Sequence, residues 1–204
     1  MHAASDGSQL LIDHESAAGP TVLQVRGSLI VSSLQTLRDL GHFSRYEQNL
    51  PAALHDDVLY ALAASWLPLE VAMAHYGACD AMNLQDSELD SIGQAVSGRI
   101  MGTFLGTILR GSRQVGAQAA PLVALRHYDK LWDRLLVGGT CHVRQTGPKD
   151  AVIASKGLGM FRYRYFRVAY ASLIRGAGLM FAKIFYTRVQ RTSDTSMVVG
   201  ISWV

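Results

Sequence analysis

The sequence is short of cysteine and of charge, and both shortages narrow the kinds of protein it can be. Cys79 and Cys141 are its two cysteines, too few for a disulfide-stapled scaffold or a zinc finger. We therefore expect reduced, buried thiols. Charged residues make up 17% of the chain and hydrophobic residues 49%, whereas about a quarter of an average soluble domain is charged. This composition favours a large core, an internal cavity or an apolar interface.

Long uninterrupted apolar runs are also missing. A membrane-spanning helix needs about 18 or more consecutive apolar residues, and the apolar segment 97–111 carries polar or charged residues at or near both ends, at Ser97, Arg99 and Arg110. Residues 1–20 contain neither a basic leader nor an apolar block, so they do not match a secretory signal. We expect a cytoplasmic protein without a transmembrane segment.

Recognisable catalytic motifs are missing as well. No serine or cysteine lies in a nucleophile motif such as Gly-x-Ser-x-Gly. Gly157 and Gly159 form a Gly-x-Gly pair without the third glycine of a dinucleotide site. Asp56 and Asp57 are adjacent, so on a helix their carboxylates point about 100° apart. These absences count against an ordinary enzyme.

Hydrophobic periodicity predicts a helical first half. Residues 1–20 are small, polar and aperiodic, so we expect a flexible tail followed by a single domain over 21–204. The spacing of apolar residues, with glycine and proline as boundaries, predicts helices over 27–40, 43–50, 51–65, 66–82, 87–111 and 121–139.

The pattern changes after Gly139. Segments 140–147 and 151–155 flank a turn and predict one hairpin, and segments 179–190 and 196–204 predict a second. Residues 160–178 return to helical spacing between the two hairpins. This order predicts an α+β fold, in which N-terminal helices precede a β-β-α-β-β unit that forms a four-stranded antiparallel sheet covered by helices.

Three glycines four residues apart mark the segment 97–111. Gly98, Gly102 and Gly106 would line one face of a helix. Each interior glycine costs about 0.5–1 kcal/mol relative to alanine, so something should approach the helix closely there. Internal packing, a homodimer seam and space for a ligand all remain open as explanations.

Aromatic residues are the natural lining of any space between the helices and the sheet, although the same residues can form plain core. His75 and Cys79 lie four apart on a predicted helix, but two ligands do not make a zinc site. We therefore expect no metal and no cofactor. The candidate ligand-binding residues are Trp66, His75, Gly102, Phe104, Gly106, Trp132, Phe161 and Tyr165.

Four arginines, Arg162, Arg164, Arg167 and Arg175, fall close together in the sequence, which has a net charge of +3. Such a cluster can meet phosphate or an acidic partner, or can be the solvated face of a helix. We take it as a solvated face and expect no nucleic-acid partner.

Short motifs spread along the chain resemble a known family. They are VRGSLI (25–30), LRDLG (37–41), NLPAAL (49–54), SWLPLEVAMAHYGA (65–78), LWDRLLVGGT (131–140) and ISWV (201–204). The chain is similar to a large myxobacterial paralogous family of uncharacterised proteins, which is related in fold to 4-vinyl-reductase-like domains, transport-protein-particle subunits and haem nitric-oxide-binding domains. The resemblance implies the same α+β layout, with a small apolar ligand or acyl chain held between helices and sheet, or dimerisation through helices.

The resemblance also implies one specific alternative. In the haem-binding relatives a histidine ligates iron and a Tyr-x-Ser-x-Arg run grips the haem propionates. Tyr170, Ser172 and Arg175 approach that run with one extra residue before the arginine, and His75 or His127 would be the iron ligand. The favoured function is a non-enzymatic ligand-sensing or scaffold domain, expected to be a homodimer, that binds a small hydrophobic molecule or a partner protein. A haem-dependent or small-molecule-dependent sensor or enzyme is the alternative.

Overall fold

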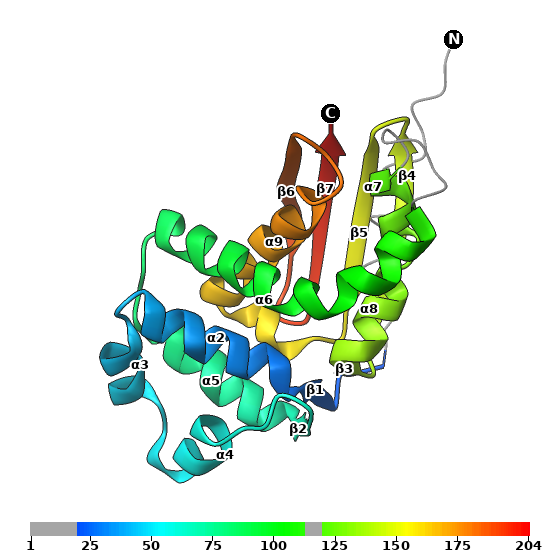
Figure 1. The fold of residues 1–204 in the computed structure, drawn as a ribbon. Helices are drawn as coiled ribbons and strands as arrows, with labels where there is room; N and C mark the ends of the chain where they lie inside the picture. Colours follow the sequence, from blue (N-terminus) through cyan, green and yellow to red (C-terminus); the bar gives the residue numbers. More distant parts are fainter. Residues whose placement is uncertain (1–19, 113–119) are drawn as a thin grey trace.

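The structure is a computed structural model that describes residues 20–112 and 120–204, and it consists of a helical part followed by a sheet with helices packed against it (Figure 1). The predicted tail, apart from Pro20, lies outside the described residues. The described helices are α2 (Gly27–Asp39), α3 (Phe43–Asn49), α4 (His55–Leu59), α5 (Leu69–Ala81), α6 (Asp86–Ser112), α7 (Ala120–Leu125), α8 (Tyr128–Leu135) and α9 (Arg164–Gly178), with short 3-10 turns η1 (Ala52–Leu54) and η2 (Gly159–Arg162).

The strands form two sheets. The larger is antiparallel in the order β4-β5-β7-β6, and the smaller has the order β2-β1-β3. The strands are β1 (Gln24–Arg26), β2 (Trp66–Pro68), β3 (Leu136–Val137), β4 (Thr140–Gly147), β5 (Asp150–Lys156), β6 (Phe185–Thr192) and β7 (Ser196–Trp203). The α+β prediction, with its two hairpins and intervening helix, is confirmed.

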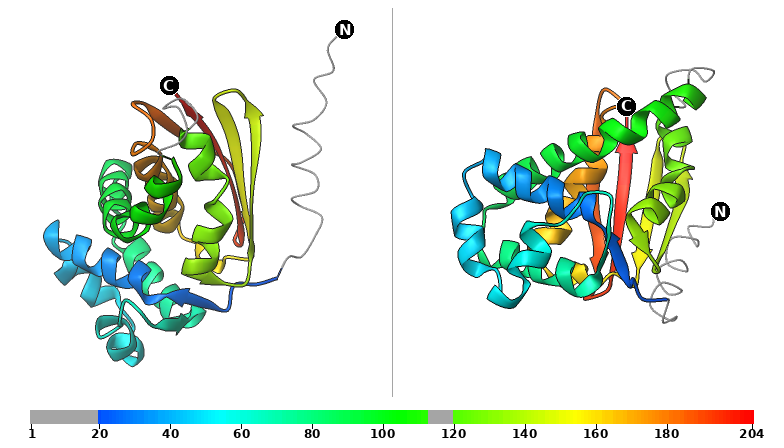
Figure 2. Two further views of the ribbon diagram at one scale, coloured as in Figure 1. Left: turned by 45° about the vertical axis from the view of Figure 1, so that its right-hand side comes forward. Right: turned by 60° about the horizontal axis from the view of Figure 1, so that its bottom comes forward.

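The four-stranded sheet carries its helical layer on one side, where α6, α8 and α9 lie (Figure 2). Ile153 of β5 is paired with Val199 of β7 in the middle of the sheet, and both side chains are buried. The alternation along these strands therefore turns their branched residues towards the helices. This arrangement leaves the space between helices and sheet as the place where a ligand site can form.

The long helix α6 packs on α9 at two glycines. A Cβ on Gly93 would collide with the carbonyl oxygen of Ala169, and a Cβ on Gly176 would lie 2.9 Å from the Cβ of Ser97. Gly98, the first residue of the predicted glycine face, has no atom within 4 Å of its Cβ position. Internal packing is therefore the wrong explanation for Gly98, and the close approach occurs at glycines the sequence pattern did not select.

Two predicted helices are shorter in the structure. The segment 51–65 is helical only through η1 and α4, and residues 66–68 form β2 instead of the first turn of α5. Arg26 and Trp66 are register partners in the small sheet, and Gly27 donates its backbone N–H to Ser65 at 2.9 Å. Pairing with β1 therefore overrides the helical pattern of the apolar residues here, and Leu62 is left exposed.

Two further boundaries differ from the predictions. The predicted helix 121–139 is interrupted at Arg126 and His127, where the N–H of His127 bonds to the carbonyl of Ala124 and a new helix begins. The strand predicted from Leu179 begins at Phe185, because residues 179–182 bond back to the last turn of α9.

Among the described residues, no helix combines the length and apolarity needed to cross a membrane. Cys79 and Cys141 are free thiols, the first buried and the second half-buried, as expected for Cys79.

Candidate ligand-binding site

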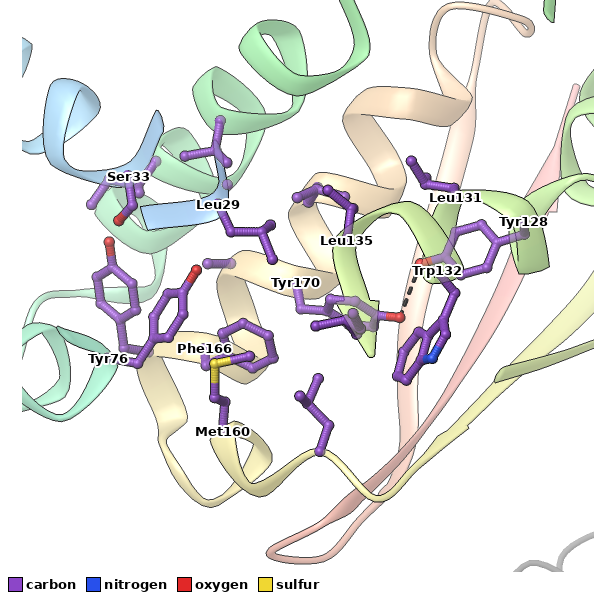
Figure 3. A pocket seen from close by; sticks show the side chains of 18 residues that line it. Leu29, Ser33, Tyr76, Tyr128, Leu131, Trp132, Leu135, Met160, Phe166 and Tyr170 are labelled. Atoms are coloured by element: carbon purple, nitrogen blue, oxygen red, sulfur yellow. Dashed lines mark hydrogen bonds between the residues drawn. The ribbon is translucent and has the colours of Figure 1, made fainter. Parts of the chain in front are cut away.

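A cavity lies where the N-terminal helices, α6, α8 and α9 meet (Figure 3). Its volume is about 60 Å³, counted as the space that the centre of a water molecule can reach. Most of its surface is apolar. The described residues that line it are Leu29, Ser33, Tyr76, Ile92, Gly93, Val96, Tyr128, Leu131, Trp132, Leu135, Leu136, Leu158, Met160, Tyr165, Phe166, Ala169, Tyr170 and Leu173.

Helical spacing explains why α8 and α9 face the cavity. Tyr128, Leu131, Trp132 and Leu135 repeat every three or four residues along α8 and so form one apolar stripe. Residues 165–173 supply a second stripe on α9. The lack of a side chain at Gly93 lets α6 come close to α9, and this contact closes the space between the two stripes.

One end of the cavity holds a chain of polar side chains. The hydroxyls of Tyr128 and Tyr170 are 2.9 Å apart, and that of Tyr170 lies 3.2 Å from the Ser155 hydroxyl. Ser155 is in turn 3.6 Å from the Cys141 sulfur. Burial raises the pKa of Tyr128 and of Tyr170, and it raises the pKa of Cys141 to about 12. These groups are therefore neutral hydrogen-bonding partners at physiological pH.

The opposite end holds a hydroxyl that lacks a partner. Tyr165 is 2% exposed and lines the cavity, yet its hydroxyl makes no hydrogen bond among the described residues. Burial raises its pKa, and Cys79 and Ser33 also influence that pKa, although neither has the geometry of a hydrogen-bond partner. A buried unpaired hydroxyl costs about 1–3 kcal/mol, so a bound molecule with a polar group has something to gain here.

His75 lies behind this end of the cavity rather than in it. Its Nδ1 is 2.8 Å from the Tyr46 hydroxyl and its Nε2 is 2.9 Å from the Ser33 hydroxyl. Burial lowers the pKa of His75 to about 3, so the ring is neutral and both nitrogens are already paired. His75 is thus a structural residue in this conformation.

The predicted ligand-binding residues separate into three groups. Trp132 and Tyr165 line the cavity. Phe161 is fully buried against Phe166 and Tyr170, behind the lining, and Trp66 is 36% exposed on β2 with the Arg26 guanidinium over its ring. The prediction that Trp66, His75 and Phe161 share one site with Trp132 is therefore not met by their positions.

The glycine-rich part of the prediction is not reached by the described side chains. Gly102, Phe104 and Gly106 belong to α6, but their side chains and surroundings lie outside the described residues. The main residues that sequence reasoning missed are Ser33, Tyr76 and Tyr170 as cavity lining. Their one signal in the sequence is helical spacing, which does not reveal the helix they face.

A second, smaller cavity lies on the other side of α8, between α7 and α9. Its volume on the same measure is about 40 Å³. Leu131, Tyr128 and Leu173 line both cavities and so separate them. The other described lining residues are Pro121, Ala124, Leu125, His127, Ile174, Ala177, Gly178, Phe181 and Phe185.

The arginine cluster braces α9 instead of forming an open cationic face. Arg164 pairs with Asp86 and donates to the Leu84 carbonyl, and Arg167 donates to the carbonyls of Phe161 and Arg162. Arg175 pairs with Asp90, which also accepts from Ser172 at 2.5 Å. Ser172 and Arg175 thus face α6 whereas Tyr170 faces the cavity, so the near match to a propionate-binding run does not form one site.

Within the described residues, no three histidine, cysteine or acidic side chains gather as a metal site would require. The arrangement suits the binding of an apolar molecule and supplies no group placed to transfer a proton or to act as a nucleophile.

This arrangement of helices, sheet and cavity is that of the H-NOX (haem nitric oxide/oxygen-binding) fold. The Fe(II) unliganded H-NOX protein from K. algicida superimposes with a TM-score of 0.64 at 10% identity, over 88% of this chain and 96% of that one. An oxygen-binding H-NOX domain related to soluble guanylate cyclases, solved as its oxygen complex, gives 0.54 at 11% identity over 87% and 94%. A single-substitution mutant of T. tengcongensis H-NOX gives 0.53 at 13% identity over 87% and 97%.

No protein-family model and no curated protein matches the chain. At these identities the structural likeness shows the fold alone, and the resemblance to the myxobacterial family stays a prediction. The predicted relation in fold to haem nitric-oxide-binding domains is confirmed.

Proposed function

We propose that this chain is a non-enzymatic sensor domain that binds a small hydrophobic molecule in the cavity between α6, α8 and α9, without haem. The observation that carries the proposal is the composition of the lining: its described residues include no charged side chain, and the Tyr165 hydroxyl is left without a partner. Apolar cavities stay dry and accept apolar guests. A hydroxyl or carbonyl on the guest would pair with Tyr165.

A haem group does not fit the residues present. The structural neighbours carry haem by name, but no histidine or cysteine is among the described residues lining this cavity, and no cation there could pair with the propionates. Both nitrogens of His75 are paired, and His127 lines the second cavity. A tyrosine can ligate iron as a phenolate, but burial raises the pKa of Tyr128, Tyr165 and Tyr170 and so opposes that form.

Size points the same way. An apolar cavity of about 150 Å³ holds one benzene ring, whereas this one measures about 60 Å³. A porphyrin contains four pyrrole rings, so it would require the helices to separate. A narrow or very small molecule is the better match.

The cavity is placed to convert binding into a change of shape. Leu29 and Tyr76 come from the N-terminal helices α2 and α5, and Trp132 and Phe166 come from α8 and α9. A guest touches both parts of the fold at once, so it favours whichever relative packing of the helices gives it the better contacts.

Native mass spectrometry of the purified protein, compared with the denatured protein, tests the proposal. We expect a retained small mass that is lost on denaturation. The same sample, mixed with haemin and desalted, should show no stoichiometric Soret absorbance. A Soret band that survives desalting at one haem per chain would contradict the proposal and establish the haem alternative.

The subunit count comes from the same spectra. The expected homodimer, and docking of a partner protein on the helices, stay predictions. A dimer without added mass would favour the scaffold form of the function over the ligand-sensing form.

A further inference from the structure

The two cavities on either side of α8 are arranged in series. Ser33 and Tyr76 lie at one end of the first cavity, and Tyr128 and Leu131 lie at the other (Figure 3). Tyr128, Leu131 and Leu173 also line the second cavity. A path from Ser33 towards α7 therefore crosses one thin wall of side chains.

The wall is built to be displaceable. Leu131 packs in a small apolar cluster with Ala124, Ala177 and Phe181, separate from the main core of the protein. A leucine outside the main core can change rotamer without disturbing the packing of the larger core. Rotation of Leu131 would join the two spaces.

The shape of the joined space selects its occupant. Each cavity alone is smaller than the space that one benzene ring needs, since they measure about 60 and about 40 Å³. A chain of methylenes is narrower than an aromatic ring and can pass from one space into the next. Both linings are almost entirely apolar, so the end group of such a chain should be uncharged.

We propose that the two cavities form one bipartite site for an unbranched alkyl chain with a neutral polar end group, and that Leu131 is the partition the chain displaces. This inference rests on the proposed function and specifies its ligand class. The polar end group stays in the first cavity, and the tail enters the second beside Ala177.

A series of n-alkanols from 1-butanol to 1-decanol, titrated calorimetrically into the full chain, tests the inference. Each buried methylene should tighten binding about fourfold. Ala177 lines only the second cavity, so Ala177→Leu should leave short alkanols unaffected and make the affinity level off at a shorter chain length than in the parent protein. Leu131→Ala removes the partition and should tighten binding of the long alkanols selectively.

The controls separate the possible failures. Leu84 is buried outside both linings, so Leu84→Ala should lower the melting temperature without changing the chain-length profile. Superimposable profiles for the parent and Ala177→Leu proteins would overturn the bipartite site while leaving the first cavity as a binding site. If Ala177→Leu does not fold, a Leu131→Ala profile identical to the parent's overturns it equally. Failure of every alkanol to bind would overturn the proposed function itself, and the inference with it.

Discussion

The hydroxyl groups of Tyr128 and Tyr170, 42 residues apart in sequence, lie 2.9 Å from each other and join α8 to α9 at the end of the cavity. Tyr170 also reaches Ser155 on β5, at 3.2 Å. Two helices and the sheet are therefore connected through one phenol. Because the surroundings are buried and apolar, loss of a partner here is more costly than it would be at the surface.

Tyr170→Phe should therefore destabilise the protein more than Tyr128→Phe. Removal of the Tyr170 hydroxyl leaves both Tyr128 and Ser155 without that partner, and we expect a loss of about 1–3 kcal/mol. Removal of the Tyr128 hydroxyl leaves the bond between Tyr170 and Ser155 intact. Urea unfolding of both single variants and the double variant measures the coupling, and equal losses in the two single variants would show that Tyr170 is not the shared partner.

Stability should fall with pH in the range set by His75. Burial lowers the pKa of His75 to about 3 from its ordinary value of 6.5, so the unfolded chain binds a proton there at pH values where the folded chain does not. The contribution is complete above pH 6.5 and is lost as pH falls towards 3. At pH 5 the loss should be about 2 kcal/mol.

Unfolding free energies at pH 7 and pH 5 check this for the parent protein and for His75→Gln, in which the pH dependence should be flatter. His142 is exposed on β4, so His142→Gln is a matched control that should keep the parent's slope. A slope that survives in His75→Gln would assign the pH dependence to other groups.

The two glycines of α6 should respond oppositely to alanine. Gly93→Ala puts a methyl group onto the Ala169 carbonyl and 2.6 Å from the Ser172 Cβ, and such overpacking costs about 1–3 kcal/mol. Gly98 has open space, so Gly98→Ala should stabilise the helix by about 0.5–1 kcal/mol. Thermal melts of the two variants give the signs, and a stabilised Gly93→Ala would mean that the contact between α6 and α9 is loose.

The ion pair between Asp90 and Arg175 should matter more than the one between Asp39 and Arg99. Asp90 also accepts hydrogen bonds from Ser172 and Gln94, and its side chain is 32% exposed, whereas Asp39 is 47% exposed. We expect about 1–2 kcal/mol of destabilisation for Asp90→Asn and less than about 1 kcal/mol for Asp39→Asn. Chemical denaturation in low and high salt compares them, and similar losses would rule out a special role for the network around Asp90.

The layout of the fold was largely predictable because its signals are local. The change from helical to alternating spacing after Gly139 identifies the two hairpins, and helix boundaries at Asp39 and Ser112 lie within about one residue of those predicted from glycine positions. The errors occur where a distant segment decides the local structure. Residues 66–68 become a strand because β1 lies beside them, and no property of those three residues announces it.

The candidate site was less predictable for the same reason. Trp132 and Tyr165 could be chosen as bulky aromatic residues, and both line the cavity. The choice of Phe161 used the same criterion, yet its ring lies one layer deeper. Which aromatic residue faces a space and which fills the core depends on how α8 and α9 are rotated against each other, and that rotation is set by contacts such as Gly93 with Ala169.

Leu131 belongs to both cavities, and this has a consequence for how the protein can vary. A substitution at this position changes two compartments in one step, so their sizes cannot be adjusted independently through α8. Val96 on one side and Ala177 on the other each line a single cavity. Divergence in ligand preference between related chains should therefore accumulate at the outer walls, while the shared leucine changes only when the whole length of the site is being redrawn.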